Sequence, residues 1–264
     1  MPLTRRQRQQ AGKAFAVVFP VGLAAYVAAR ADWGRLQDKF FDPKVAGDLF
    51  PRIITVAVKN TIELTALSFL VGAAIGLVIA LLRLSPFRAY RWIGTVYVEI
   101  FRGIPAIVTL ILVGFVIPIA LGAHVPGGDL GARVTGLSVV AGAYIAEVIR
   151  AGILAVPKGQ SEAARSLGMG PTRTMVSVVL PQALRIVVPP MTNELVLLLK
   201  DTSLVFVLGT TADTIELTKY GRDAVGRTFN GTPITVIALL YLCISLPLTR
   251  LSGLLEKRGA RSRR

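Results

Sequence analysis

Long apolar runs separated by short polar stretches make up most of this chain. Six of these runs are long enough to cross a hydrocarbon core of ~30 Å as helices, and they cover residues 14–31, 58–82, 93–121, 134–155, 183–209 and 232–251. The first run has Arg30 where a signal peptidase would cut, which favours an uncleaved span over a signal peptide. The pattern therefore predicts an all-α integral membrane protein with about six transmembrane helices.

The composition agrees with a membrane protein. The 264 residues are 53% hydrophobic and carry a net charge of +15, and the mean hydropathy is +0.62. The cations lie between the apolar runs, as juxtamembrane charges do, so we expect no nucleic-acid partner. With one cysteine, Cys243, and one histidine, His124, the chain offers no material for a disulfide framework or a histidine-based catalytic or metal site. We expect His124 to be a solvated loop residue.

The distribution of Lys and Arg predicts the orientation in the membrane. The two ends of the chain and the loops 83–92 and 156–182 are rich in these residues, whereas the loops 32–57 and 210–231 mix both signs. The positive-inside rule then places both termini and the loop 156–182 in the cytoplasm. The basic N-terminal tail is expected to be disordered.

The loop between the fourth and fifth runs contains a helix-prone polar segment, residues 159–168. Ser161 can cap a helix whose first turn carries Glu162, where a carboxylate suits the positive end of the helix dipole. Ala163 and Ala164 give this helix a face with almost no side-chain bulk. Such a smooth face suits contact with another protein.

A glycine turn follows this helix. Gly168 and Gly170, with Pro171 behind them, end the helix and turn the chain. Residues 173–180 can form a second short helix, which Pro181 stops. Two short helices joined by a glycine turn predict a knob that docks into a groove on a partner protein.

The polar loop resembles the EAA loop of permease subunits of ATP-binding-cassette (ABC) importers. The resemblance rests on Glu162-Ala163-Ala164, on Gly168 after three further residues, and on Val178-x-Leu180-Pro181 after nine more. The flanking segments are similar to those of polar amino-acid permeases, and they are residues 98–105, 144–152, 181–183 and 200–204. The similarity covers about residues 50–256. The departures are Val178, where the family often has Ile, and the additional first span.

The resemblance implies a type I ABC importer permease fold with a cytoplasmic coupling-helix loop. The residues that it assigns to ATPase coupling are Glu162, Ala163, Ala164, Gly168, Leu180 and Pro181. It implies residence in the plasma membrane of a prokaryote, and its expected partners are a cytoplasmic ATP-binding-cassette subunit, a second permease subunit, an extracytoplasmic amino-acid-binding protein and the lipid bilayer. No G-x-x-x-x-G-K-[ST] motif occurs, so ATP and Mg²⁺ belong to the partner ATPase and this chain is not expected to be an enzyme or to hold a cofactor.

The same resemblance suggests a division of the chain into four parts. Residues 58–253 are expected to form the ABC importer transmembrane domain, and residues 14–57 an extra N-terminal helix with an external segment. Residues 1–13 and 254–264 are the basic cytoplasmic tails.

The third span contains a pair of opposite charges followed by a proline. Glu99 and Arg102 stand three residues apart and can meet on one helix face, which lowers the cost of burying them. Pro105 removes a backbone hydrogen bond and predicts a kink whose freed carbonyls face protein or water. Glu99 and Arg102 are therefore candidates for the substrate pathway, and a packed kink with a structural ion pair is the alternative.

The fifth span carries the largest conflict with lipid. Its thirteen Ile, Val, Leu or Phe residues between 186 and 209 contribute about −4 to −8 kcal/mol to insertion, while Lys200 and Asp201 cost about 5 to 7 kcal/mol. These two point about 100° apart on a helix, and Thr202 and Ser203 tolerate an unwound turn. Discontinuous helices present such groups at transporter binding sites. We predict a substrate pathway lined by these four residues, with a buried structural network as the alternative.

The function predicted from these features is import of polar amino acids of the glutamate, glutamine or arginine type. A lysine next to an aspartate suits any zwitterion, so the charges leave the individual amino acid open. The alternatives are an ion-driven secondary transporter, an ABC permease for another small polar solute, and a structural membrane protein without a pathway. A secondary transporter would not account for the coupling loop, and a structural membrane protein would not account for the intramembrane charges.

Overall fold

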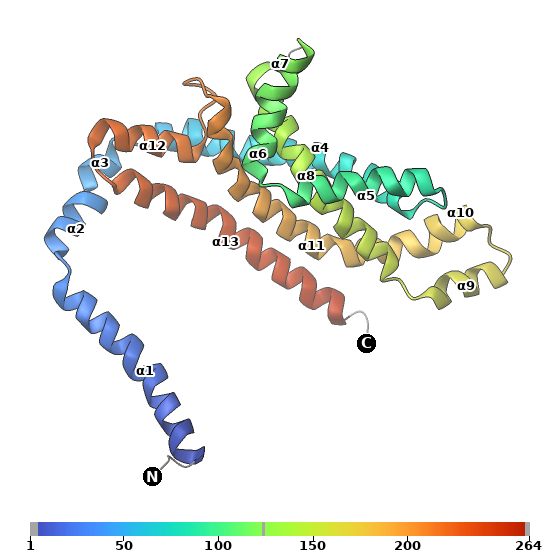
Figure 1. Cartoon of the computed structure of the whole chain (residues 1–264), viewed down its shortest axis with the longest axis horizontal. Coiled ribbons are helices and arrows are strands. Elements are labelled where there is room, and N and C mark those ends of the chain that lie inside the picture. Colours follow the sequence, from blue (N-terminus) through green and yellow to red (C-terminus); the bar gives the residue numbers. More distant parts are fainter. Residues whose placement is uncertain (1–4, 123–124, 262–264) are drawn as a thin grey trace.

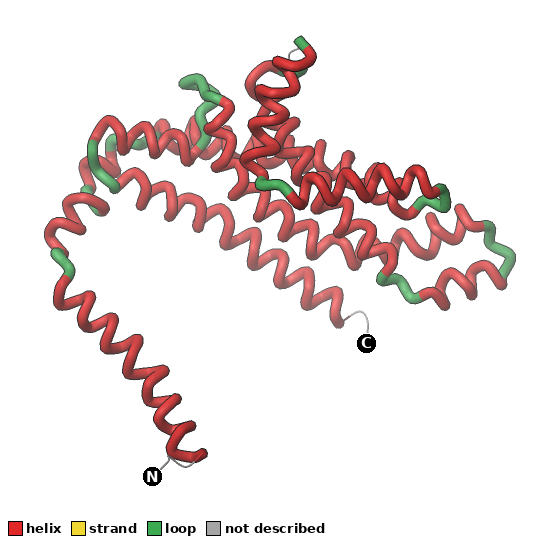
Figure 2. Tube along the Cα trace, viewed as in Figure 1, coloured by secondary structure: helices red, strands yellow, loops and turns green. Residues whose placement is uncertain are grey.

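The computed structural model describes residues 5–122 and 125–261, and His124 lies outside this part. The described chain is helical almost throughout and contains no strand, as the apolar runs predict (Figure 1). Loops are short and join the ends of the helices (Figure 2). The predicted all-α fold class is confirmed.

The elements follow one another with few residues between them. In chain order they are α1 (Arg5–Arg30), α2 (Trp33–Phe40), α3 (Pro43–Gly47), the π-helical turn η1 (Ile53–Val58), α4 (Lys59–Leu84), α5 (Arg88–Gly103), α6 (Ala106–Ile111), the π-helical turn η2 (Leu112–Val116), α7 (Ile117–Leu121), α8 (Gly128–Leu154), α9 (Lys158–Ser166), α10 (Pro171–Thr174), the π-helical turn η3 (Met175–Val179), α11 (Leu180–Asp201), the 3₁₀ helix η4 (Thr202–Leu208), α12 (Leu217–Thr228) and α13 (Thr232–Arg261).

Four helices of the described part are long and apolar enough to cross a membrane. They are Ile53–Leu84, Gly128–Leu154, Pro171–Leu208 and Thr232–Leu255. Two bent pairs pass the same test together: Phe15–Arg30 with Trp33–Gly47, bent by 82°, and Arg88–Gly103 with Ala106–Leu121, bent by 111°. If each bent pair is one span, the described part has the six predicted spans.

The third predicted span is broken rather than gently kinked. α5 ends at Gly103, Ile104 is extended with φ −101° and ψ 149°, and Pro105 stands directly before α6. Proline disfavours a helical conformation in the residue before it, so the chain leaves the helix at Ile104. The predicted change of direction at Pro105 is therefore present, and it is a break of 111° between two helices rather than a kink within one.

Small residues set the packing of the bundle. α4 runs along α8, and a Cβ added at Gly76 would lie 2.6 Å from the side chain of Ile145. At Gly72 the nearest atom would be the Cβ of Ala141 at 3.1 Å. Helix association in lipid relies on close approach of this kind, as the small residues of the second span suggest.

The two ends of the bundle carry different elements. α2, α3 and α12 lie at one end, which we call the α12 end, and α9 and α10 lie at the opposite end, which we call the α9 end (Figure 1). α11 and α13 pack against each other and run between the two ends.

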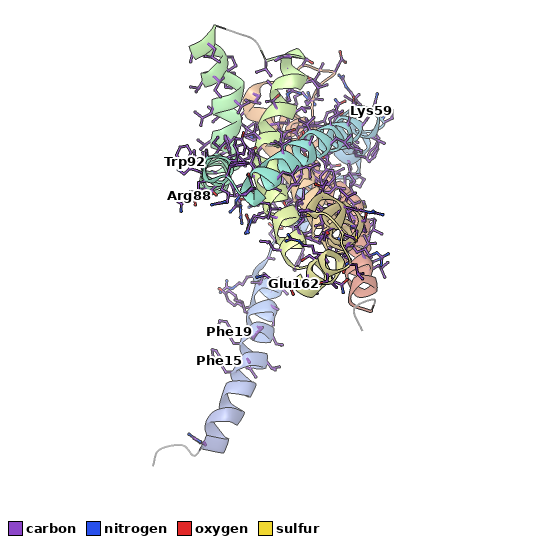
Figure 3. The ribbon with its side chains drawn as sticks, turned by 90° about the vertical axis from the view of Figure 1, so that its right-hand side faces the viewer. Phe15, Phe19, Lys59, Arg88, Trp92 and Glu162 are labelled. Atoms are coloured by element: carbon purple, nitrogen blue, oxygen red, sulfur yellow. The ribbon has the colours of Figure 1, made fainter. Side chains whose placement is uncertain are left out.

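The N-terminal helix stands apart from the bundle. Every described side chain of α1 is exposed, and Phe15 and Phe19 stack on each other away from the other helices (Figure 3). The helix begins at Arg5, so the expected disorder of the basic tail is wrong for residues 5–13. The next helix, α2, is anchored at the α12 end, because Gly231 donates a backbone hydrogen bond of 2.6 Å to the carbonyl of Lys39.

Candidate functional site

The predicted coupling loop contains the short helix α9 and a glycine turn. α9 ends in a Schellman motif: Met169 N–H bonds to Ala164 O at 3.1 Å and Gly168 N–H bonds to Arg165 O at 3.0 Å. This motif requires a left-handed residue at its turn, and Gly168 has φ +81°. The predicted helix stop at Gly168 is thus present, with a defined hydrogen-bond geometry.

The start of α9 differs from the prediction. α9 begins at Lys158, directly after Pro157, so Ser161 lies inside the helix and its hydroxyl donates to Lys158 O at 2.8 Å instead of capping. Proline fixes a φ that suits the residue before a helix start, and this moves the N-terminus three residues upstream of the predicted cap. The prediction of Ser161 as the cap is wrong.

The two alanines of the loop face in different directions. Ala164 is only 5% exposed, and its carbonyl accepts the Met169 N–H of the Schellman motif. Glu162 and Ala163 are exposed, and Figure 3 shows Glu162 at the edge of the bundle. The expected smooth two-alanine face is therefore half wrong: Ala163 is available to a partner and Ala164 supports the fold of the loop.

The exposed tip of the α9 loop carries a large apolar side chain, Leu167, that the sequence analysis did not select. Leu167 is 84% exposed, at the residue between α9 and Gly168. Arg165 and Arg173 are exposed on the same loop. A large exposed apolar side chain on a rigid turn is a feature of interaction surfaces. The sequence feature that could have identified Leu167 is its place as a large apolar residue between a polar helix and the glycine turn.

The second predicted helix of the loop is not a separate element. Pro171–Leu208 is one continuous helical stretch, in which α10 and η3 lead into α11. Pro181 follows directly after the π-helical turn η3, where the backbone hydrogen-bond pattern changes from π- to α-helical and accommodates a residue without an N–H. The prediction that Pro181 stops a helix is wrong. Leu180 and Pro181 are exposed at the base of this span.

A charge cluster ties the α9 end to the core of the bundle. Glu147 on α8 forms ion pairs with Arg150, as the three-residue spacing predicts, and with Arg83 on α4. Val179 and Ala183 bury their side chains against Val156 below the loop. α9 contacts η3, so force applied to α9 would pass first to the start of the span Pro171–Leu208.

A cavity of about 270 Å³ lies between α6, α8 and α11. Its walls combine two carboxylates and a phenol with apolar side chains, and the lining residues are Ile104, Ala106, Val140, Ala141, Tyr144, Glu194, Leu197, Leu198 and Asp201. We call it the carboxylate pocket. The broken helix at Ile104 forms part of its wall, as expected of a discontinuous span.

The four predicted residues around the fifth-span break separate in the structure. Asp201 lines the carboxylate pocket, whereas Lys200 is exposed outside it, as the ~100° rotation between neighbours requires. Thr202 is fully buried and its hydroxyl donates to Leu199 O at 2.7 Å, so it does not face the pocket. Ser203 is half-buried and lies outside the lining residues. The expected unwound turn is not found at these residues: α11 continues directly into η4, where the helix tightens into a 3₁₀ helix within the stretch Pro171–Leu208. The prediction of a break at Thr202 and Ser203 is therefore wrong.

The predicted pair in the third span is not formed. Among the ion pairs of the described residues, none joins Glu99 to Arg102. Arg102 instead lies over the ring of Tyr144, 5.2 Å from its centroid, and is near enough to Glu194 for their charges to attract. The break at Ile104 places Arg102 beside the pocket, which explains the change of partner. Glu99 is exposed and lies outside the pocket.

Glu194 and Tyr144 are pocket residues that the sequence interpretation did not select. Glu194 precedes Asp201 by seven residues, which is two helical turns, so both carboxylates lie on one face of α11. This spacing was the signal that could have identified Glu194. Tyr144 comes from a different helix, and its place in the pocket depends on how α8 packs.

A buried carboxylate lies at the α12 end. Glu216 is 1% exposed and caps α12, accepting bonds of 2.6 Å from the backbone N–H groups of Thr218 and Lys219. Burial raises the pKa of Glu216 from its ordinary value of 4.5 to about 7, although these bonds and the charge of Arg133 favour the ionised form. The charge of Glu216 therefore depends on pH near neutrality.

Comparison with known proteins gives a consistent identity. The model of the family described as "Binding-protein-dependent transport system inner membrane component" matches residues 72–261. The chain is 39% identical over 172 residues, 65% of this chain and 68% of the relative, to the L-cystine transport system permease protein TcyB of Bacillus subtilis (strain 168). It is 34% identical over 199 residues, 75% of this chain and 88% of the relative, to the arginine transport system permease protein ArtQ of the same organism.

A solved structure agrees with the sequence relatives. A chain from the crystal structure of an amino acid ABC transporter with histidines is 33% identical, with a TM-score of 0.72 over 82% of this chain and 98% of that chain. The fold and the relatives thus agree with the resemblance seen in the sequence. The chain belongs to the family of binding-protein-dependent transport system inner membrane components, the permease subunits of ABC importers.

Proposed function

We propose that this chain is the membrane-spanning subunit of an importer that moves polar amino acids into the cytoplasm. Its assembly contains cytoplasmic ATPase subunits, a second permease subunit that is identical or homologous, and an extracytoplasmic amino-acid-binding protein. ATP and Mg²⁺ act in the ATPase, and this chain contributes the pathway. Both termini and α9 lie in the cytoplasm, in keeping with the distribution of Lys and Arg.

The observation that carries the proposal is the geometry of the α9 loop. A nine-residue helix with a hydrogen-bonded glycine turn projects from the bundle, exposes Leu167 and Glu162, and contacts η3 at the start of the span Pro171–Leu208. A loop that served only as a connector would not need this rigidity. The ATPase would grip this loop, and closure of two ATPase subunits around ATP would draw two such loops together and rock the permeases as rigid bodies.

The carboxylate pocket supports an amino-acid substrate. Two carboxylates, Glu194 and Asp201, face one cavity, with Arg102 beside its wall. A zwitterion fits this arrangement, because its ammonium group can lie against the carboxylates while its own carboxylate lies toward the guanidinium. The excess of negative charge favours amino acids with a cationic or neutral side chain over acidic ones. Relatives named for arginine and L-cystine transport agree with this range.

The first experiment is purification of the tagged chain from its native membrane in mild detergent, with the stoichiometry of every co-purifying protein. An ATP-binding subunit in equal number, lost on substitution within residues 162–168, is the expected result. A chain that purifies alone and is unaffected by such substitutions would contradict the proposal and favour an ion-driven transporter.

Substrate identity needs a second assay on the same complex. The complex in liposomes, with its binding protein inside or outside as orientation requires, should show ATP hydrolysis stimulated by an amino acid and uptake of that amino acid. Stimulation by a different small polar solute, with none from any amino acid, would leave the importer assignment intact and overturn the substrate class.

A further inference from the structure

The 3₁₀ helix η4 links the carboxylate pocket to the α12 end of the bundle. Asp201, the last residue of α11, lines the pocket, and η4 begins at the next residue. η4 ends at Leu208 and is capped by Gly209, which has φ +78°, and the nonhelical loop 210–216 leads on to α12. A 3₁₀ helix of seven residues is long for a conformation with poor hydrogen-bond geometry, so other contacts must hold it.

A buried arginine holds the far end of η4. Arg133 on α8 is 2% exposed. Its guanidinium donates to Gly209 O at 2.6 Å, to Thr214 O at 2.7 Å and to the Thr214 hydroxyl at 3.2 Å. Burying a cation costs several kcal/mol unless hydrogen bonds and nearby charges compensate it. Here the compensation comes from loop carbonyls, with the carboxylates of Asp129 and Glu216 near enough to attract it.

Side chains from α4 fix the same loop from another direction. Asn60 donates to Asp213 O at 2.7 Å and to Ile215 O at 3.0 Å, and the Thr61 hydroxyl accepts the Leu217 N–H at 3.0 Å. The loop that follows η4 is therefore held by two spans through its backbone. It cannot shift without breaking several hydrogen bonds at once, and the one from Leu217 to Thr61 is buried.

A second arginine clamps the middle of η4. Arg222 on α12 lies 4.3 Å from the ring centroid of Phe206, within cation–π distance. Arg222 is exposed, so this contact connects the surface of the α12 end to η4. The exposed face of α12 and the pocket wall at Asp201 are thus joined through one seven-residue element.

We propose that Arg133 is a positioning residue. By holding Gly209 and Thr214, Arg133 fixes η4, and η4 in turn fixes the pocket wall at Asp201. Arg222 connects events at the surface of α12 to the same helix, η4. Arg133 acts through η4 and does not touch the substrate. The functional consequence rests on the importer function proposed above, whereas the structural coupling does not. Loss of the clamp should leave the complex assembled but reduce the amount of substrate moved per ATP.

The first test measures the coupling without any substrate. Amide hydrogen exchange of the purified complex is compared between the unmodified chain, Arg133→Gln and Arg133→Lys. We expect exchange in residues 202–216 to rise about tenfold in Arg133→Gln, because several charge-assisted bonds are lost. Arg133→Lys, which can reach fewer carbonyls, should lie between the two, and residues 158–181 should be unchanged in both. Unchanged exchange in residues 202–216 of a folded Arg133→Gln chain would overturn the proposal.

Arg222 provides a test that does not disturb the buried cluster. Arg222→Ala should raise exchange in residues 202–208 about threefold, in line with a modest cation–π contribution. Arg227→Ala, on the exposed last turn of the same helix, is the matched control and should have no effect. If Arg133→Gln does not fold, the comparison of Arg222→Ala with Arg227→Ala tests the proposal. Equal hydrogen exchange in residues 202–208 of these two variants would overturn it.

The functional readout is the ratio of imported substrate to hydrolysed ATP in liposomes. This ratio does not depend on how much protein folds, so a purely structural defect leaves it unchanged. We expect it to fall about fivefold in Arg133→Gln and less in Arg222→Ala, with the affinity for the loaded binding protein retained in Arg133→Gln. An unchanged ratio in both variants would overturn the functional part of the proposal. Failure of the unmodified complex to transport any amino acid would refute the proposed substrate instead, and the exchange results would stand.

Discussion

Gly168 allows the sharpest test of the coupling loop, because its conformation and its surroundings point to a single cause of damage. Its φ of +81° is one that a β-branched residue rarely adopts, and no atom lies within 4 Å of the position that a Cβ would take. Gly168→Val therefore causes backbone strain without a steric clash. The two Schellman bonds, from Gly168 to Arg165 and from Met169 to Ala164, depend on that backbone.

The expected cost follows from this geometry. A non-glycine residue held in the left-handed region costs about 1 to 3 kcal/mol, with valine toward the upper end. This strain falls on the nine-residue helix α9, whose folded turn would become about 5- to 150-fold less populated relative to open forms. The spans are untouched, so insertion and the amount of protein in the membrane should stay normal. Uptake and co-purification of the ATPase should both drop at least about fivefold.

The control for Gly168→Val lies two residues away. Gly170 has φ −64° and ψ 160°, a region that valine adopts readily before a proline, and it also has open space around it. Gly170→Val should therefore retain most of the transport. Normal transport by Gly168→Val, or an equal defect in Gly170→Val, would refute the view that a rigid turn transmits force to the bundle.

Three further predictions concern other parts of the chain. Asp201→Asn should lower uptake at least about tenfold if the pocket carboxylate holds the substrate cation, whereas Lys200→Gln, one residue away but outside the pocket, should have little effect on uptake. Leu167→Asp should leave thermal stability unchanged, because the side chain is 84% exposed, yet reduce ATPase co-purification. Glu216 has a folded-state pKa raised from 4.5 to about 7, so its contribution to stability is complete below about pH 4.5 and is lost as the pH rises through 7. The melting temperature in detergent should fall over this interval by an amount equivalent to about 3 kcal/mol, and Glu216→Gln should flatten the profile; a parallel profile in the variant would contradict the assignment to Glu216.

The elements that the sequence predicts well depend on local patterns. The apolar runs identify the spans because length and hydropathy alone decide whether a helix can cross a bilayer. Gly168 marks a helix end because few other residues tolerate the left-handed turn. Pro181 shows the limit of such rules: it lies inside the continuous helical stretch Pro171–Leu208, directly after the π-helical turn η3, where the backbone hydrogen-bond pattern changes.

The candidate site was only partly predictable, because helix packing decides which side chains meet. Asp201 was found through the insertion cost of a charge in an apolar run, and Glu194 lies on the same face of α11 two turns earlier. That periodicity was visible in the sequence. Tyr144 and Arg102 come from other helices, and their meeting at 5.2 Å depends on the break at Ile104.

Arg133 shows most clearly what a linear pattern omits. It lies directly before the predicted fourth apolar run, where a cation is normally a flanking residue in water. In the structure α8 begins five residues earlier and the loop 209–216 folds over the guanidinium, so the side chain is 2% exposed. The carbonyls that make this burial tolerable belong to residues 76 and 81 positions away. A charged residue at the end of a span can therefore be a solvated juxtamembrane residue or a buried one that holds a loop, and the difference depends on whether backbone from a distant part of the chain covers it. The hydrogen-exchange experiment on η4 distinguishes these two roles directly.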